Sequence, residues 1–490
     1  MGVGQVSQHV EAAAARSPID LLTDAARLAD VDTLAGRSLL DRAGVVAISA
    51  IGSWPYPDPG ALLARKLGIS PARTAVSAVG GNSPQLLVNE MAERIQRNEL
   101  DVALIGGAES MHTRWRARRE PRVELTWENG DDPPCEWVIG DGRPGASEYE
   151  SAHFALAPTT VYPLFETALR HAEGRSIDEH QRHVSELWAR FSAVAAENPN
   201  AWSRTAYSAE EIRTVSPDNR MVCFPYPKRM CANIDVDQAA ALILCSFESA
   251  RAAGVPDDRM VFLHAAAESH DHYFFSERDT LTDSPAIEVA VADAVAAAGI
   301  TLDDIARFDL YSCFPAAVQV ATRSLHLGDD DPRPLTVTGG LGFAGGPVNN
   351  YPAHAIARMV EVLRADPTAF GCTTALGWYI TKHATGIWSA SPPQHGFRRV
   401  DASVSQALVD ARPRREPAGL IDGPVTVEAT AVAFERDGLP SLGIVTGLAA
   451  DGRRAIANSR DPDLLEAFTT EAHEGTTMRI TNDGTTNTVA

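Results

Sequence analysis

The stretch TAVSAVGGNSPQLLVNEMAERIQRNELDVALIGGAESM, residues 74–111, describes a strand, a glycine turn, a helix and a second strand in succession. Ser83 is a suitable N-cap for the helix, and Pro84 then takes its first position. Apolar residues recur every four positions along one face of that helix: Leu87, Met91 and Ile95. This spacing predicts a buried helix between two strands of a largely parallel sheet.

The turn before the helix contains Gly80 and Gly81, and the sequence leaves two interpretations of it open. The start of a helix presents free backbone N–H groups and a partial positive charge, which suit an oxyanion, a thiolate or a phosphate. The alternative is that the two glycines only make a tight connection between strand and helix.

Short apolar strands and alanine-rich helices alternate through most of the first 390 residues. Further strands are predicted at residues 45–51, 102–107, 260–266 and 335–340. Two of these strands end in Gly-Gly, near residues 107 and 340, which indicates two similar halves. The pattern is typical of an α/β fold with helices on both faces of its sheets.

Composition excludes several classes of protein. The 490 residues carry a net charge of −21, which would repel a phosphate backbone and disfavours nucleic-acid binding. The longest apolar run, residues 239–245, is far shorter than the ~18 to 20 residues of a membrane span. The opening MGVGQVSQHV lacks the features of a secretory signal, which predicts a cytoplasmic protein. The six cysteines form no C-x-x-C pair, so we expect neither disulfides nor a metal site.

Two regions depart from the alternation. Residues 112–229 are rich in Arg, Trp and Pro and in long polar helices, which indicates an insertion. A charged, proline-containing linker at 411–419 marks a domain boundary, so residues 1–410 are expected to fold without the C-terminal part. Within residues 412–490, Asp437-Gly438 and Asp451-Gly452 separate β-rich runs, and Asp-Gly is a strong hairpin signal. An all-β barrel is predicted there.

Four segments, in this order, resemble the thiolases, in particular those related to the sterol-carrier-protein thiolases. They are residues 74–111, DLYSCFPAAV (309–318), GGLGFAGGPVNNYPAHAIARMVEVL (339–363) and ALGWYITKHATGIWS (375–389). The resemblance implies a thiolase fold, in which two similar βαβαβαββ halves stack in five layers.

The resemblance also implies a division of the chain. The N-terminal half would comprise residues 1–111 and 230–255, and the C-terminal half residues 256–395. Residues 112–229 would be the inserted loop domain, which covers the pantetheine tunnel in thiolases. Residues 412–490 resemble the additional domain of thiolase-like protein type 1, an oligonucleotide-binding-like barrel.

The catalytic groups of thiolases are replaced in this sequence. The resemblance places Gly80 at the nucleophilic cysteine and Gly346 at the histidine of the Gly-His-Pro loop. Tyr311 takes the place of an Asn or His, and Ser312 that of the neighbouring acidic residue. Because glycine cannot form an acyl-enzyme, standard thiolase catalysis is predicted to be absent.

Four catalytic candidates remain: Tyr311, Ser312, Cys313 and His383. Cys313 and His383 would make a nucleophile and its base if the fold brought them together; the alternative is a structural cysteine. Tyr311 could donate a hydrogen bond to a thioester oxygen, or it could fill the pocket, since a large residue there compensates for the volume lost at Gly346.

Coenzyme A (CoA) or an acyl-CoA is the implied substrate or ligand, and no covalently bound cofactor is expected. Its thioester oxygen could meet the backbone N–H groups of Gly80, Gly81, Gly345 and Gly346. Its phosphates could meet a basic cluster at the start of the insertion, which is otherwise a solvated face: Arg114, Arg116, Arg118, Arg119 and Arg122.

The resemblance therefore implies a relative of acetyl-CoA acetyltransferase, an acyltransferase of lipid metabolism, that binds CoA thioesters but lacks the nucleophile. The competing interpretation is a non-catalytic acyl-CoA-binding or scaffolding subunit that reaches a partner protein through the C-terminal domain. The few aromatic residues of that domain, Phe434 and Phe468, disfavour single-stranded nucleic acid as its ligand. Both a homodimer and a monomer remain open.

Overall fold

The first of two central sheets belongs to the N-terminal half. The computed structural model describes residues 1–120 and 123–489. Its first sheet has the order β1-β8-β4-β2-β3-β5, with β2 parallel to β3 and β4, and β8 antiparallel to β4 and β1. The strands are β1 (Gly2–Ser7), β2 (Val45–Ile48), β3 (Arg73–Ser77), β4 (Val102–Ser110), β5 (Val138–Ile139) and β8 (Asp237–Cys245).

The second sheet belongs to the C-terminal half and has the order β10-β11-β12-β9-β13. Its strands are β9 (Phe262–His270), β10 (Ile305–Asp309), β11 (Phe370–Gly377), β12 (Lys382–Ser389) and β13 (Arg398–Arg399). The prediction of a strand at residues 335–340 is wrong. The N–H groups of Val337 and Thr338 donate to the buried Asp309 carboxylate at 2.9 and 3.2 Å, so they cannot join a ladder.

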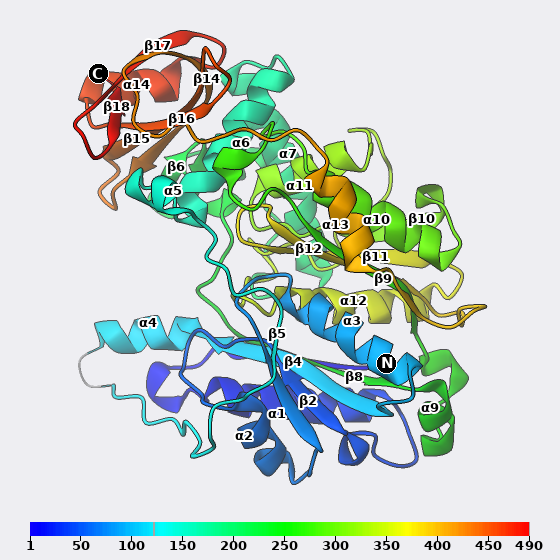
Figure 1. Cartoon of the computed structure of the whole chain (residues 1–490). Helices are drawn as coiled ribbons and strands as arrows, with labels where there is room; N and C mark the ends of the chain where they lie inside the picture. Colours follow the sequence, from blue (N-terminus) through cyan, green and yellow to red (C-terminus); the bar gives the residue numbers. More distant parts are fainter. Residues whose placement is uncertain (121–122, 490) are drawn as a thin grey trace.

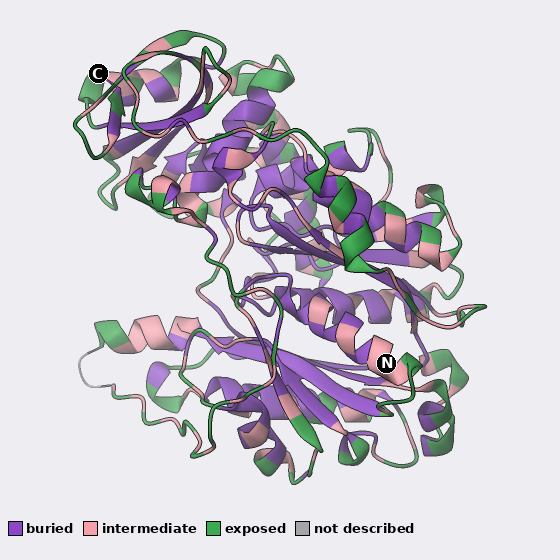
Figure 2. Cartoon of the chain, viewed as in Figure 1, coloured by how far each residue is buried: buried purple, intermediate pink, exposed green. Residues whose placement is uncertain are grey.

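Helices separate and cover the two sheets in five layers, as predicted (Figure 1). The central layer contains α3 (Ser83–Gln96) and α12 (Tyr351–Ala365), which pack against both sheets and each other. The outer helices are α1 (Pro18–Asp32), α2 (Pro59–Leu67) and α9 (Phe247–Ala253) on one side, and α10 (Pro285–Ala298), α11 (Pro315–Ser324) and α13 (Ala402–Asp410) on the other. Both sheets are buried almost throughout (Figure 2).

Helix α3 begins one residue differently from the prediction. Asn82 precedes the helix, and Ser83 and Pro84 fill its first two positions. The Ser83 hydroxyl donates to the Ala78 carbonyl at 2.8 Å, so it closes the turn instead of capping the helix. The buried positions Leu87 and Met91 follow the predicted spacing.

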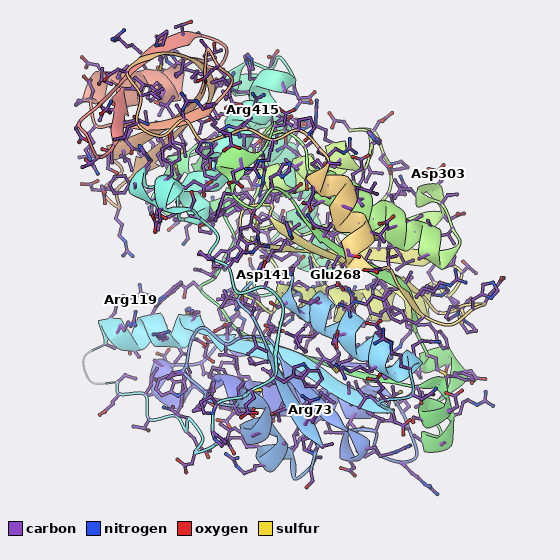
Figure 3. All side chains as sticks on the ribbon, viewed as in Figure 1. Arg73, Arg119, Asp141, Glu268, Asp303 and Arg415 are labelled. Atoms are coloured by element: carbon purple, nitrogen blue, oxygen red, sulfur yellow. The ribbon has the colours of Figure 1, made fainter. Side chains whose placement is uncertain are left out.

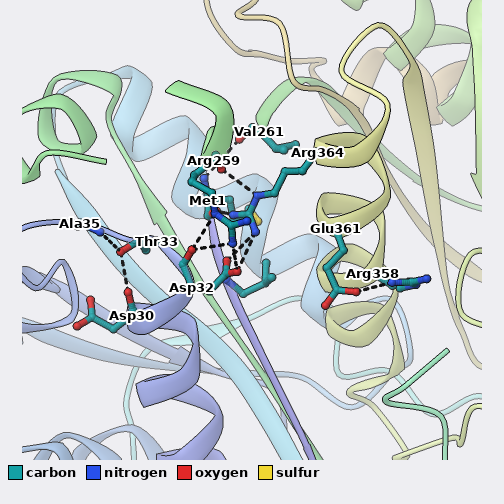
Figure 4. A network of polar contacts seen from close by, with 11 residues as sticks. Met1, Asp30, Asp32, Thr33, Ala35, Arg259, Val261, Arg358, Glu361 and Arg364 are labelled. Atoms are coloured by element: carbon teal, nitrogen blue, oxygen red, sulfur yellow. Dashed lines mark hydrogen bonds and ion pairs between the residues drawn. The ribbon is translucent and has the colours of Figure 1, made fainter. Parts of the chain in front are cut away.

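A polar network ties the two halves together at the end of α1 (Figure 4). Arg364 on α12 donates to both carboxylate oxygens of Asp32 at 2.8 and 2.9 Å, and to the Met1 carbonyl at 2.7 Å. Arg259, just before β9, donates to the same carboxylate. The first strand and helix are thereby fixed against the C-terminal half.

The insertion contributes to two other parts of the fold. Its elements, besides β5, are α4 (Met111–Arg119), α5 (Glu148–Ala152), α6 (Pro158–Ala172), α7 (Ile177–Glu197), α8 (Ala209–Arg213), β6 (Met221–Phe224) and β7 (Tyr226–Pro227). Strand β5 pairs with β3 in the first sheet, whereas β6 pairs with β14 of the C-terminal barrel. The predicted insertion therefore connects the N-terminal sheet to the barrel.

The C-terminal barrel closes through pairing of β14 with both β15 and β17. Its elements are β14 (Gly423–Phe434), β15 (Pro440–Ala449), β16 (Arg454–Ser459), α14 (Pro462–Thr470), β17 (Thr477–Asn482) and β18 (Asn487–Val489). The two Asp-Gly turns connect β14 to β15 and β15 to β16, as predicted. Helix α14 is an addition to the predicted strands; Leu465 and Phe468 bury its inner face.

Candidate functional site

The site suggested by the sequence is the turn between β3 and α3, where Gly80 replaces a cysteine. Gly80 has φ +155°, a conformation that L residues rarely adopt. A Cβ atom at this position would lie 2.6 Å from Asn82 Oδ1 and 2.9 Å from Lys382 Nζ. The space that a nucleophilic side chain would need is thus bordered by an amide oxygen and an amine.

Lys382 reaches this turn from the start of β12 in the other half of the molecule. Its side chain is buried, with a residue exposure of 5%, and Nζ donates to the carbonyls of Val79 and Asp141 at 2.8 and 2.9 Å. Figure 3 places Asp141 beside the start of α3. Burial lowers the pKa of Lys382 to about 8; Asp141 opposes this shift and Arg143 adds to it.

The backbone N–H of Gly80 is not free to meet a ligand, contrary to the expectation. It donates to Asn349 Oδ1 at 2.9 Å, and the Asn349 amide group in turn donates to the Ala50 carbonyl at 2.7 Å. The N–H of Gly346 donates to the Asn233 carbonyl at 2.9 Å. Two of the four expected oxyanion donors are therefore used within the protein.

The other two glycines, Gly81 and Gly345, allow close packing. A Cβ at Gly81 would lie 2.3 Å from the Tyr311 hydroxyl oxygen, and one at Gly345 would lie 2.0 Å from Gln238 Oε1. Gly345 also has φ +108°, which favours glycine. Both positions are constrained by side chains that approach the backbone.

Tyr311 lies in the space next to Gly81 and is buried. Its ring meets that of Tyr351 edge-on, with 5.4 Å between centroids, and its N–H donates to Thr374 at 3.0 Å. Burial raises the pKa of its hydroxyl. Of the two interpretations of Tyr311, this packing favours the one in which the ring fills the pocket.

Cys313 and His383 are not brought together as a nucleophile and base. Burial raises the pKa of the Cys313 thiol to about 12, while a hydrogen bond with Tyr162 opposes the shift, so the thiol stays protonated near neutral pH. Ser312, its neighbour, is buried against Gly340. The Ser312 hydroxyl has no hydrogen-bond partner among residues 1–120 and 123–489.

His383 lies on the opposite face of β12 from Lys382, because successive side chains of a strand alternate. Its Nε2 lies 3.4 Å from Asp271 Oδ2 and 3.5 Å from Ser284 Oγ, the N-cap of α10. Burial favours a raised pKa for Asp271, but hydrogen bonds and the charges of Arg278 and His383 hold the pKa below its usual value. His383 therefore belongs to a buried cluster that anchors α10.

Lys382 is the residue that the sequence interpretation missed, although one signal was present. Of the 43 Lys and Arg residues, only three are lysines: Lys66, Lys228 and Lys382. A chain that uses arginine almost everywhere keeps a lysine in the final loop of the thiolase pattern. An arginine there could not lose its proton, whereas a lysine can.

The basic cluster lies away from this turn. Arg119 lies at the outer end of α4, which projects from the first sheet (Figure 3). Arg114 donates to the Gly52 carbonyl at 2.9 Å, and Arg116 pairs with Glu11. Arg118 is exposed on the same helix, and Arg122 lies outside the described residues. These contacts fit the solvated-face interpretation for the members that the structure describes.

Within residues 1–120 and 123–489, no group of three or more His, Cys, Asp or Glu side chains could hold a metal ion. All six cysteines are free thiols. None of the described helices has the length and apolar character that a membrane crossing requires. A groove of about 360 Å³ lies between α7, α11 and the acidic loop at residues 328–336.

Comparison with known proteins places this geometry in a family. Residues 405–485 match the model of the thiolase-like protein type 1 additional C-terminal domain. A search of curated proteins found no match. A monomeric SCP2-thiolase-like protein type 1 from Mycobacterium smegmatis is 33% identical, with a TM-score of 0.85, and the alignment covers 100% of this chain and 97% of that one.

More distant structures share the fold. The Ltp2-ChsH2(DUF35) aldolase is 19% identical, with a TM-score of 0.59 over 79% of this chain and 96% of that one. Human mitochondrial 3-ketoacyl-CoA thiolase in complex with CoA is 17% identical, with a TM-score of 0.55 over 80% and 97%. The full-length alignment at 33% identity, together with the domain match, shows that the chain belongs to the type 1 family of SCP2-thiolase-like proteins.

Proposed function

We propose that this protein binds CoA or an acyl-CoA thioester and does not catalyse thiolysis. The main support is the turn at Gly80, where no side chain can carry an acyl group and where the backbone N–H already donates to Asn349. The solved complex of a thiolase of the same fold with CoA supports the choice of ligand. We also propose a cytoplasmic location, which the six free thiols favour.

The proposed binding region lies where the insertion covers the two halves. We retain the division into residues 1–111 with 230–255, 112–229, 256–395 and 412–490 as a proposal. The groove between α7 and α11 is a poor place for the CoA phosphates, because Asp329, Asp330 and Asp331 line it. We therefore propose a CoA site on the other side of the insertion, nearer Tyr311 and away from these carboxylates.

Two measurements test this proposal. Calorimetric titration with CoA and a medium-chain acyl-CoA should give saturable heat, and ligand at one hundred times its dissociation constant should stabilise the fold by about 2.7 kcal/mol. A thiolase assay with acetoacetyl-CoA should give no turnover above background. Turnover by the wild type would contradict the absence of thiolysis, and a flat titration would contradict CoA binding.

The second candidate function is that of a scaffolding subunit. It is favoured by the additional C-terminal domain and by the compound name of a protein of related fold, the Ltp2-ChsH2(DUF35) aldolase. The exposed Leu439 at the tip of the β14–β15 hairpin and Leu420 before β14 are candidate contacts. Loss of a captured partner on Leu439→Asp, with CoA binding retained, would support this candidate.

We propose that the chain is a monomer, as its relative from Mycobacterium smegmatis is said to be. Strand β5 covers the end of β3 by pairing Val138 with Val76 and Ile139 with Ser77. This pairing occupies part of the sheet edge beside the α3 turn, which would otherwise be open to a second copy. Light scattering after size exclusion should give 52.4 kDa.

A further inference from the structure

We propose that Lys382 is a nucleophile at the Gly80 turn, where its amine condenses with a small uncharged aldehyde or ketone to form an imine. The site consists of Lys382, Asn82 and the Gly80 turn, beneath the loop at residues 140–145. The inference goes beyond CoA binding and does not depend on it, because the reacting amine and its ligand are different.

The hydrogen bonds of Lys382 match those of a neutral amine. Among the described residues, Nζ has two acceptors, the carbonyls of Val79 and Asp141. An NH₂ group has two N–H donors, so both are satisfied and the lone pair remains free. No carboxylate in the described chain forms an ion pair with Nζ, since the Asp141 side chain pairs with Arg143 at 2.6 Å. An ammonium ion here would have the face of the Trp378 ring, whose centroid is 5.7 Å from Nζ, but no carboxylate as its counter-charge.

The amine lies next to the Gly80 turn. Nζ lies 2.9 Å and Cε 3.1 Å from the place where a Cβ of Gly80 would be. The nucleophile position of the thiolase fold is therefore approached by an amine that comes from the opposite half. The burial that lowers the pKa of Lys382 to about 8 increases the fraction of free amine near neutral pH.

Asn82 supplies a second, independent indication of a ligand. Its residue exposure is 8%, and its Oδ1 has no hydrogen-bond partner in the described residues. That oxygen lies 2.6 Å from the same missing Cβ. A buried acceptor without a donor is costly, so a ligand hydroxyl placed there would be stabilised.

The unpaired acceptor also selects the chemistry. The lone pair of Nζ attacks the carbonyl carbon, and a proton from nitrogen passes to the carbonyl oxygen to give a neutral carbinolamine. Its hydroxyl can donate to Asn82 Oδ1. The C–O bond then breaks as the hydroxyl takes the remaining N–H proton and leaves as water, and the C=N bond forms with no oxidation or reduction.

The loop at residues 140–145 covers Lys382, since the Asp141 carbonyl accepts from Nζ, and a small ligand would have to enter beneath this loop. Gly142, Arg143 and Pro144 are exposed, whereas Gly145 packs against the Trp378 ring. Arg143 lies over the Tyr273 ring at 3.9 Å, so its charge is held outside the site and paired with Asp141. With Tyr311 against Gly81, the deeper space is filled.

Borohydride trapping tests the inference in the wild-type chain. The protein is incubated with propanal, reduced with sodium borohydride and digested, and alkylation at each lysine is measured by mass spectrometry. Lys66, paired with Asp20 and Glu128, and the exposed Lys228 are internal controls. We expect at least ten-fold more alkylation at Lys382 than at either control near pH 8, with a midpoint close to the pKa of about 8.

Variants separate a reactive site from a merely accessible amine. Lys382→Arg should remove the preferred alkylation. Asn82→Leu should lower alkylation of Lys382 several-fold, and an unchanged melting temperature would confirm that this variant is folded. Asn82→Asp, which keeps an acceptor but adds a charge, should restore trapping with its midpoint moved to higher pH. Equal alkylation of the three lysines, or none at Lys382 in the folded wild type, would overturn the inference. Neither result would bear on CoA binding, which is measured without carbonyl compounds.

Discussion

The barrel interface, where the C-terminal barrel contacts the rest of the chain, and the Gly80 turn each contain a buried basic side chain. The charges of the two side chains are compensated differently. Arg454, at the start of β16, is 0% exposed; it donates to Glu428 through Nε and Nη2 at 2.7 and 2.8 Å. It also donates to carbonyls of the segment before α10, including that of Phe275 at 3.0 Å. Among the described residues, Lys382 has two carbonyl acceptors and no carboxylate partner.

This difference in partners indicates the role of each region. A guanidinium keeps its charge under all ordinary conditions, so its burial requires a carboxylate and many acceptors. A buried amine without such a partner lowers its own charge by losing a proton. The barrel interface is therefore built to hold two parts of the chain together, whereas the Gly80 turn keeps a group that can change its protonation state.

The largest expected effect comes from Arg454→Met. This change leaves the Glu428 carboxylate and several carbonyls of the segment before α10 without their hydrogen-bond donor. The loss should lower the free energy of unfolding by about 3–5 kcal/mol. Chemical denaturation followed by fluorescence measures it. Arg453→Met is the matched control, because Arg453 pairs with Asp451 at the surface and should cost less than about 1 kcal/mol. Similar losses of stability in the two variants would show that the buried ion pair of Arg454 contributes no more than a surface pair.

Gly80→Cys should have the next largest effect. The positive φ and the approach of Asn82 Oδ1 to 2.6 Å should lower the free energy of unfolding by about 1–3 kcal/mol. The new thiol should give no thiolase turnover, because the backbone donor beside it is taken by Asn349. Gly142→Cys, where a Cβ meets nothing within 4 Å, is the control for an added thiol. Thiolysis by Gly80→Cys would show that the turn can relax.

The two-half fold could be predicted from the sequence because it depends on local patterns and on the order of four segments. The Asp-Gly hairpins of the barrel were predictable for the same reason. Helix α14 was missed although Asp461 and Pro462 are typical N-cap and first-turn residues. The prediction of a strand at 335–340 was wrong because N–H groups of this segment donate hydrogen bonds to the buried Asp309, which is distant in sequence.

The candidate site was less predictable because it joins residues about 300 positions apart. His383 was selected as the histidine of the final loop, but the alternation of β12 places Lys382 toward Gly80 and His383 toward α10. The linker was expected to be a free boundary. Instead, the Arg415 N–H donates to Glu277 and that of Ala418 to Arg454, so independent folding of residues 1–410 stays a prediction.

Lys382→Met tests whether the Lys382 amine at the Gly80 turn loses its charge in the folded chain. The pKa of Lys382 lies near 8 in the folded chain and near its usual 10.5 when unfolded, so the unfolded chain binds more protons between these values. Wild-type stability should therefore rise relative to Lys382→Met as pH increases from 8 to 10.5, by about 1–2 kcal/mol after solvent screening. Below pH 8 the variant should be at least as stable as the wild type. A variant less stable at pH 7 would mean that the amine is compensated like Arg454.

The smallest expected effect concerns His153, a second test of the barrel interface. Its Nδ1 donates to the Tyr149 carbonyl at 2.8 Å and its Nε2 accepts the Asn487 N–H at 2.9 Å, so only the neutral ring fits. Burial lowers its pKa, so the stability that the neutral ring contributes is present above the usual value of 6.5 and is lost as pH falls below it. We expect a loss of about 1 kcal/mol in the wild type between pH 6.5 and 5, relative to His153→Gln, which cannot be protonated. Equal pH dependence in both proteins would show that the ring tolerates its charge and that the barrel docks without regard to it.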